Sequence, residues 1–306
     1  FLLSVVMLYF GWFGLIDELL RLYVQHEILL ALAFFGVLML ASDILTLPFQ
    51  WYSTFVIEEK YGFNKTTVKT FVTDKLKGYL IGAILGGGIL SLLIYLIETI
   101  GPDFWILFSL LAAILILLVN MFYTSIFLPM FNKLTPLQEG ELKTAIEAFS
   151  KKINFPLDNI FVIDGSKRSN KANAFFSGIG RKKKIVLYDT LITNHTTEEL
   201  VAVLAHEVGH FKKKHIIWGY FLSVIQVVFT LFVLSLMIQS STVSLAMGGS
   251  QSAIHLNLLA FGILFSPISG FIGLFMSMYS RKNEFEADAY AKETFSGTAL
   301  ANALKK

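Results

Sequence analysis

The sequence predicts a mostly α-helical, polytopic integral membrane protein with about six visible transmembrane helices and one α+β insert with a short β-sheet. The first observation is composition, because 55% of the 306 residues are hydrophobic and only 15% are charged, against about 25% in soluble domains. The mean hydropathy is also high, at +0.66. The third observation is that apolar segments of about twenty residues recur, which is the length that crosses a bilayer as a helix.

Charge and cysteine content limit the possible partners and sites. The net charge of +3 is too small to indicate nucleic acid as a partner, whereas the lipid bilayer is an obligatory one. The chain has no cysteine, so disulfides are excluded. Any metal ion must therefore be held by His, Asp or Glu.

We expect six membrane spans, at residues 1–16, 28–48, 79–97, 104–128, 216–238 and 254–279. Three connections, 17–27, 98–103 and 239–251, contain a single Lys or Arg, Arg21. The alternate connections carry nearly all the others, and six spans place the two sets on opposite faces of the membrane. The positive-inside rule then puts the basic connections in the cytoplasm. Both the bacterial inner membrane and the endoplasmic reticulum fit this topology.

The spans divide the chain into four segments. Residues 1–130 are expected to form four transmembrane helices with a cytosolic loop at 49–78, followed by a cytosolic domain at 131–215, a transmembrane hairpin at 216–279 and a cytosolic helix at 280–306.

The polar block 131–215 reads as alternating helices and strands. Leu142, Ile146 and Phe149 recur at helical spacing, whereas residues 159–163 read as a strand. Residues 174–177 and 184–188 read as a hairpin around G-I-G-R-K-K-K. Thr196, followed by two glutamates in the first turn, marks the start of a further helix.

That helix carries the sequence V-L-A-H-E-V-G-H-F-K-K-K-H, residues 203–215. His206 and His210 are four apart, so on a helix both imidazoles can face one ion. Glu207 lies where it can take a proton from an activated water molecule. Two surface histidines on a basic helix would be the plain alternative. The pattern is typical of zinc peptidases, and it predicts His206 and His210 as metal ligands with Glu207 as the general base.

A third ligand is expected because catalytic zinc uses three protein ligands and one open position. The other histidines are poor candidates: His26 and His255 lie on the opposite membrane face, His195 precedes the motif helix, and His215 lies nine residues beyond His206. Glu284 and Asp288 are four apart just after the sixth span. The hairpin of spans five and six returns them toward His210. We expect Glu284 as the third ligand and Asp288 orienting a ligand histidine from behind, although an ordinary solvated acidic face would also give this spacing.

At this point the chain resembles the M48 family of zinc metallopeptidases, and within it the Ste24-type CAAX prenyl proteases. The further matches are I-E-E-K-Y-G-F-N (57–64), F-N-K-L-T-P-L (131–137), N-A-F-F-S-G (173–178) and K-I-V-L-Y-D-T-L (184–191), and the resemblance runs from about residue 40 to the end. It implies a hydrolase that removes the C-terminal aaX tripeptide from prenylated CaaX proteins or peptides. It also implies seven membrane helices around an intramembrane chamber, with one Zn²⁺ per chain on the cytosolic side.

The resemblance carries over to single residues. His206, His210 and Glu284 match the zinc ligands, Glu207 matches the general base, and Asn173 lies in the segment that resembles the strand lining the substrate cleft. Such a strand can bind an extended substrate through its backbone. The family is expected to have a further membrane helix before the first span and a C-terminal segment with a His and an Arg near the active site.

Two other functions remain open on the sequence. The first is a heat-shock-type protease for quality control of membrane proteins, which has the same chemistry but fewer spans. The second is a transporter or membrane scaffold with a vestigial metal site, against which the complete set of ligands and Glu207 argues. Dependence of cleavage on prenylation separates the first alternative from CAAX processing.

Overall fold

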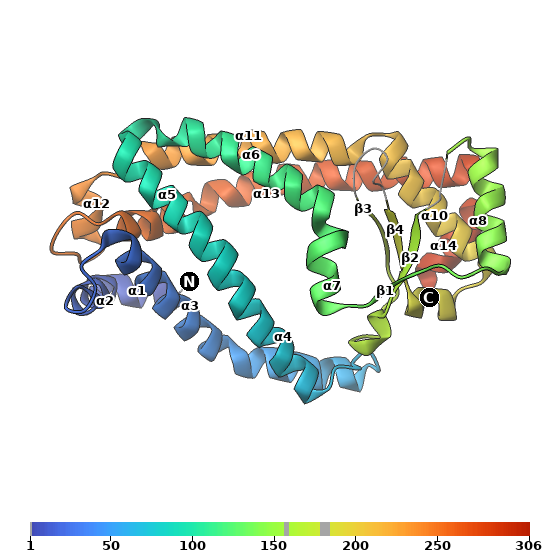
Figure 1. The fold of residues 1–306 in the computed structure, drawn as a ribbon, viewed down its shortest axis with the longest axis horizontal. Helices are drawn as coiled ribbons and strands as arrows, with labels where there is room; N and C mark the ends of the chain where they lie inside the picture. Colours follow the sequence, from blue (N-terminus) through green and yellow to red (C-terminus); the bar gives the residue numbers. More distant parts are fainter. Residues whose placement is uncertain (1, 156–158, 178–183) are drawn as a thin grey trace. The chain divides into compact units, whose positions relative to one another are not determined.

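The computed structural model (Figure 1) describes residues 2–155, 159–177 and 184–306. The chain forms two compact units. The first contains Phe1–Trp51, Thr73–Ile114 and Ser223–Gly273, and the second Tyr52–Val72, Leu115–Leu222 and Leu274–Lys306.

The first unit is built from helices. Its elements are α1 (Leu2–Tyr9), α2 (Trp12–Arg21), most of α3 (Glu27–Tyr52), the end of α4 (Val68–Ile81), the π-helix Gly82–Gly86, α5 (Gly87–Ile100), the 3₁₀ turn Gly101–Asp103, the first part of α6 (Phe104–Phe122), the end of α11 (His215–Ser235), α12 (Ser241–Ala246) and the first part of α13 (Ile254–Thr294). Apolar packing holds these helices together. One buried cluster includes Phe104 and Leu234, and another includes Phe34 and Leu256.

Four helical runs in the described chain are long and apolar enough to cross a membrane: Glu27–Glu58, Val68–Phe131, His215–Ser235 and Ile254–Thr294. The bent pair α1 and α2 adds a fifth when it is counted as one span. The run Val68–Phe131 has 64 residues, or about 96 Å of helix where about 30 Å crosses the hydrocarbon. It turns at Gly101–Asp103, and Figure 1 shows α5 and α6 running in different directions on either side. If this run is divided there and the bent pair is counted, the apolar segments number six, as the sequence predicts, and the count of membrane spans itself stays a prediction.

Two predicted boundaries are wrong. The expected helix at 1–16 breaks between α1 and α2, which are bent by 69°, because Gly11 takes a left-handed backbone conformation with φ 66° that glycine adopts at no steric cost. The expected loop at 49–78 is mostly helical, since α3 continues into the π-helix Ser53–Glu58 and α4 begins at Val68. Apolar composition does not reveal either boundary, because Gly11 lies within an apolar segment and the polar residues of 49–78 fit a helix as well as a loop.

A buried polar cluster lies in the first unit, between α2 and α13. His255 Nε2 is 2.8 Å from Asp17 Oδ1, and the two side chains are 1% and 0% exposed. Arg21 Nε lies 3.0 Å from Asp17, and Arg21 Nη1 lies 2.8 Å from Glu27. These partners satisfy charges that would be costly to bury alone.

The second unit contains the short β-sheet expected of the insert, and the sheet has four strands. Its strands are β1 (Leu134–Pro136), β2 (Ile160–Ile163), β3 (Ala174–Ser177) and β4 (Lys184–Tyr188), in the order β1-β2-β4-β3. β3 and β4 pair antiparallel, as the hairpin prediction requires, with Ala174 opposite Leu187. The expected turn around residues 178–183 lies outside the described residues. β1 is an additional strand that was not predicted, because Pro136 made this segment read as a turn.

Helices cover this sheet and complete the unit. They are the π-helix Tyr123–Phe127, α7 (Leu128–Phe131), α8 (Glu141–Lys152), α9 (Asp189–Asn194), α10 (Thr197–Lys212), α14 (Gly297–Lys305) and the adjoining ends of α6, α11 and α13. One apolar core joins α8, the sheet, α10 and α14 through residues such as Ile146, Leu187, Leu204 and Leu300. This core fixes α10, the helix that carries the histidine motif.

Candidate metal centre and active site

α10 begins at the residue that the sequence predicts. Thr196 is its N-cap: its side chain accepts a hydrogen bond from Glu199 N, and Glu199 Oε2 accepts one from Thr196 N at 2.8 Å. This capping box satisfies two backbone donors at the helix start. Lys306 Nζ lies 2.6 Å from Glu199 Oε2, and this hydrogen bond, followed by that of Thr196, lowers the pKa of Glu199. Buried Leu200, Leu204 and Val208 then leave the histidines on the other face of α10.

The end of α13 lies against α10 at a glycine. A Cβ atom on Gly209 would lie 3.0 Å from Ala287 Cα and 3.2 Å from Ala287 O. Such distances are shorter than ordinary van der Waals contact, so the two backbones approach this closely only because residue 209 has no side chain. Ala287 itself is fully buried. This approach brings Glu284 and Asp288 to the histidines of α10.

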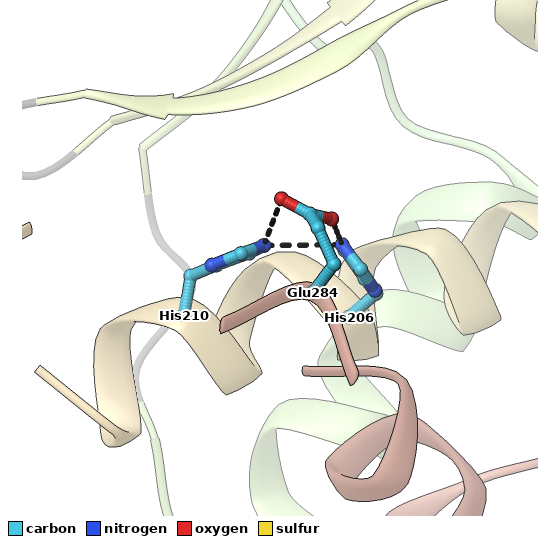
Figure 2. Close-up of side chains that lie close together, drawn as sticks. All are labelled: His206, His210 and Glu284. Atoms are coloured by element: carbon cyan, nitrogen blue, oxygen red, sulfur yellow. Dashed lines mark hydrogen bonds and ion pairs between the residues drawn. The ribbon is translucent and has the colours of Figure 1, made fainter. Parts of the chain in front are cut away.

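Three side chains converge as predicted (Figure 2). His206 Nε2 lies 3.1 Å from His210 Nε2 and 3.3 Å from Glu284 Oε2, and His210 Nε2 lies 3.7 Å from Glu284 Oε1. In the described part of the chain, this is the group whose ligand atoms could share a metal ion, and these atoms all lie within 4.8 Å of one another.

The donor set fits a zinc ion. Two imidazoles and one carboxylate are the ligands of a well-known class of catalytic zinc sites. Ligands at about 2.0–2.1 Å from one ion in tetrahedral arrangement lie about 3.3 Å apart, close to the separations between these three side chains. The ring nitrogens Nε2 of both histidines face the shared point, so their Nδ1 atoms face away from it.

The Nδ1 atoms of both histidines have partners of their own. His206 Nδ1 lies 2.8 Å from Asp288 Oδ1, the contact that the sequence predicts for this carboxylate. His210 Nδ1 lies 2.9 Å from His215 Nδ1. The spacing from His206 argued against His215 as a ligand, and its contact with His210 was not predicted. The sequence feature that could have indicated this contact is a third histidine five residues after His210, in H-E-x-x-H-x-x-x-x-H.

The electrostatic surroundings keep His210 neutral. Burial lowers its pKa from the ordinary 6.5, and the neighbouring His206 and His215 act in the same direction, whereas Glu284 opposes them. A neutral imidazole is the form that binds a metal ion. The lowered pKa therefore favours the form of His210 that can take a cation.

A cavity of about 650 Å³ opens onto this group within the second unit. Its lining includes His206, Glu207, Glu284 and Asp288 on one side and Asn173 and Ala174, at the start of β3, on another. β3 is one of the two outer strands of the described sheet. Both oxygens of Asn173 accept hydrogen bonds from nearby backbone. Its Oδ1 accepts one from Ala174 N at 2.9 Å, and its carbonyl oxygen accepts one from Tyr188 N at 3.0 Å.

The other histidines are not part of this group. His255 lies in the buried cluster of the first unit, and His26 is exposed at the start of α3. His195 also lines the cavity, but its ring nitrogens face the carbonyl oxygens of Leu191 at 2.9 Å and Ala303 at 3.2 Å. Their exclusion as ligands therefore agrees with the geometry.

Comparison with known proteins gives the family. One family model, "CAAX prenyl protease N-terminal, five membrane helices", matches residues 1–133, and another, "Peptidase family M48", matches residues 136–305. The chain belongs to peptidase family M48. The predicted family is confirmed, and the resemblance starts at residue 1 rather than near residue 40. Together with the apolar helices, M48 membership makes the chain an integral membrane protein of a metallopeptidase family.

Curated M48 relatives and a solved structure are similar over most of the chain. The chain is 38% identical to CAAX prenyl protease 1 of Saccharomyces cerevisiae over 93% of its own length and 66% of that protein's. It is 37% identical to a CAAX prenyl protease 1 homolog of Arabidopsis thaliana, over 100% and 74% of the two chains. The crystal structure of S. mikatae Ste24p matches with a TM-score of 0.91 and 34% identity, covering 98% of this chain and 75% of that one. The chain thus spans about two thirds of its yeast relative.

Proposed function

We propose that the protein is a membrane-embedded zinc endopeptidase that removes the C-terminal aaX tripeptide from prenylated CaaX proteins or peptides. The observation that carries this proposal is the convergence of His206, His210 and Glu284 at one point of a cavity that Glu207 also lines. The names of the relatives, CAAX prenyl protease 1 and its homologs, support the substrate class.

The metal centre would consist of one Zn²⁺ held by His206, His210 and Glu284. Zinc bound there would lower the pKa of a water molecule and polarise the scissile carbonyl. Glu207 takes the proton of the attacking water and then donates it to the amide nitrogen as the C–N bond breaks. The products are the prenylcysteine carboxylate and a free tripeptide amine. Asp288, through His206 Nδ1, keeps that ligand's ring in place.

The substrate would bind in extended form along β3. An outer strand offers backbone donors and acceptors to an added strand, and Asn173 and Ala174 lie where β3 meets the cavity. Such pairing holds the scissile bond straight beside Glu207. A lipid chain contributes roughly 0.8 kcal/mol per buried CH₂, so a prenylated substrate gains affinity by keeping its tail in hydrocarbon while its peptide reaches the cavity. We place the site on the cytosolic side, following the distribution of basic residues between the spans.

Cleavage of a farnesylated CaaX peptide and of its unprenylated twin tests the proposal. The protein in detergent should cut the farnesylated peptide far faster, and a zinc chelator should abolish cleavage. Glu207→Gln keeps the shape of the side chain and removes the base, so it should lower the rate by about 10²–10⁴-fold while zinc still binds. Glu284→Ala, by contrast, should lose the zinc.

The same assay separates the alternatives. Equal cleavage of both peptides would leave the zinc chemistry in place and favour a quality-control protease. Bound zinc without cleavage of either peptide would favour a transporter or scaffold with a vestigial metal site. The relatives named as CAAX prenyl proteases favour CAAX processing over these two alternatives.

A further inference from the structure

His215 lies directly behind a predicted zinc ligand. Its Nδ1 is 2.9 Å from His210 Nδ1, and its Nε2 is 3.2 Å from Glu286 Oε2. The His215 side chain is 7% exposed, whereas that of Glu286 is 39% exposed. Lys282 Nζ lies 3.8 Å from the other oxygen of Glu286. The three groups form a chain that runs from Nδ1 of His210, the ring nitrogen turned away from the shared metal point, to the surface.

The backbone is shaped to make this contact. α10 ends at Lys212 and α11 begins at His215, so the helix does not continue through the motif. Lys214 adopts a left-handed conformation with φ 61°, which costs about 1–2 kcal/mol for a residue with a Cβ atom. This turn brings the first residue of α11 back onto the last turn of α10. A continued helix would have carried residue 215 away from His210.

The positions of the protons follow from the geometry. A hydrogen bond between Nδ1 of His210 and Nδ1 of His215 needs one proton, carried by one of the two rings. If His210 carries it, His210 Nε2 is free to bind a cation, and His215 must hold its own proton on Nε2, where it donates to the Glu286 carboxylate. If His215 Nδ1 carries it instead, neutral His210 is protonated on Nε2 and cannot be a ligand, and the bare Nε2 of neutral His215 faces a carboxylate. With a cation bound to Nε2 of His210, the first arrangement satisfies every group.

We propose that His215 is a positioning residue for the metal centre: with Glu286 it fixes the tautomer and orientation of His210, as Asp288 does for His206. The inference rests on the proposed zinc function of His206, His210 and Glu284. Groups that hold the second ring nitrogen of a ligand histidine typically affect metal affinity by about 10–100-fold. Each ligand histidine then has its own support, and the two supports differ, since one is a carboxylate and the other an imidazole backed by a carboxylate.

Zinc affinity of the whole protein in detergent, measured by competition with a chromogenic chelator, tests this proposal. His215→Leu removes both contacts and should weaken zinc binding by about 10–100-fold. His215→Gln supplies an amide oxygen that can accept from His210 and an NH₂ that can donate to Glu286, so it should recover most of the affinity. Glu286→Gln keeps an acceptor and loses the charge, and its loss should be smaller, because this side chain is partly exposed.

Two further readouts separate positioning from a general loss of structure. The unfolding temperature of the zinc-free protein should be nearly the same in the Leu and Gln variants, and the visible spectrum of bound Co²⁺ should change in the Leu variant and return in the Gln variant. Exposed His26→Leu is the matched control and should leave zinc affinity unchanged.

Tight zinc binding by the wild type and by folded His215→Leu alike would overturn this inference and leave the proposed function standing. Equal losses in the Leu and Gln variants would also overturn it, since the amide restores the contacts. A wild-type protein that binds no zinc would overturn the proposed function and this inference together.

Discussion

His210 shows how a single side chain is prepared for a metal ion. Its Nε2 faces His206 and Glu284, its Nδ1 faces His215, and it is largely removed from water. Burial lowers its pKa because the charged form loses hydration. A site whose ligand resists protonation holds its metal over a wider range of pH.

The lowered pKa predicts how the zinc-free protein responds to acid. As pH falls below the ordinary value of 6.5, His210 takes up a proton in the unfolded state before it does so in the folded state. The free energy of unfolding should therefore fall as pH falls through that region, until the lower pKa of the folded state is reached. Thermal unfolding of the zinc-free protein between about pH 7.5 and about pH 5.5 measures this dependence. His210→Gln removes the group, so a slope as steep in that variant as in the wild type would contradict the prediction.

Local spacing was sufficient to predict most of the site but not all of it. His206 and His210 follow from helical geometry alone, and Glu284 and Asp288 follow once the hairpin of α11 and α13 returns the chain. His215 was missed because its distance from His206 was counted as if one helix continued. The break at Lys213 and Lys214 depends on a backbone conformation that residues of this type seldom adopt, so the spacing carried no sign of it.

The pairing of α10 with α13 is the feature of the elements on which the site depends. Gly209 precedes a histidine and Ala287 precedes Asp288, and these two small residues lie where the helices touch. The close approach therefore determines the separation between the histidines and the carboxylates. Apolar spacing alone does not predict this close approach, since a glycine between the two histidines of H-E-V-G-H does not by itself indicate a helix contact.

Gly209→Ala should weaken both the fold and the metal site. The added methyl group would meet Ala287 backbone atoms at 3.0 Å and 3.2 Å, and backbone cannot move aside as a flexible side chain can. Overpacking of this kind costs about 1–3 kcal/mol, and the shift of α13 should also lower zinc affinity. Gly262→Ala is the control, because a Cβ there meets nothing within 4 Å and the residue lies within α13, the helix that Gly209 contacts. Unfolding temperature and zinc affinity measure the two effects, and equal behaviour of the two variants would contradict this account.

At the scale of the whole molecule, apolar helices make up the first unit, while the predicted metal ligands and general base lie in the second. Composition and charge predicted the six apolar segments and the mixed insert, because burial in lipid imposes a long and easily recognised pattern. They did not predict the break at Gly11 or the helical 49–78 segment, since these depend on a single backbone angle and on how far helices continue beyond hydrocarbon. The Asp17–His255 contact could not be predicted from the sequence either, because it joins residues 238 positions apart.

Asp17 should be essential for the stability of the first unit. Asp17→Ala leaves buried His255 without its partner and removes one of the two carboxylates beside Arg21, which should cost about 3–5 kcal/mol. The double variant Asp17→Leu with His255→Leu replaces the pair by apolar groups and should recover much of that loss. Exposed Glu98→Ala, in the same unit, should change stability by less than about 0.5 kcal/mol. Thermal unfolding in detergent compares them, and a double variant no more stable than Asp17→Ala would argue against an ion-pair role.

The uninterrupted course of α13 limits how this chain can change during evolution. In the second unit, Glu284, Ala287 and Asp288 lie on the last part of α13, with helix at every residue between them. A substitution between Glu284 and Ala287 leaves the angular phase of the helix intact, but inserting one residue there would turn Glu284 by about 100° about the helix axis with respect to Ala287, the residue that packs on Gly209. Insertions or deletions there should be tolerated only near whole numbers of turns, so the length of this segment should be inherited more faithfully than its sequence.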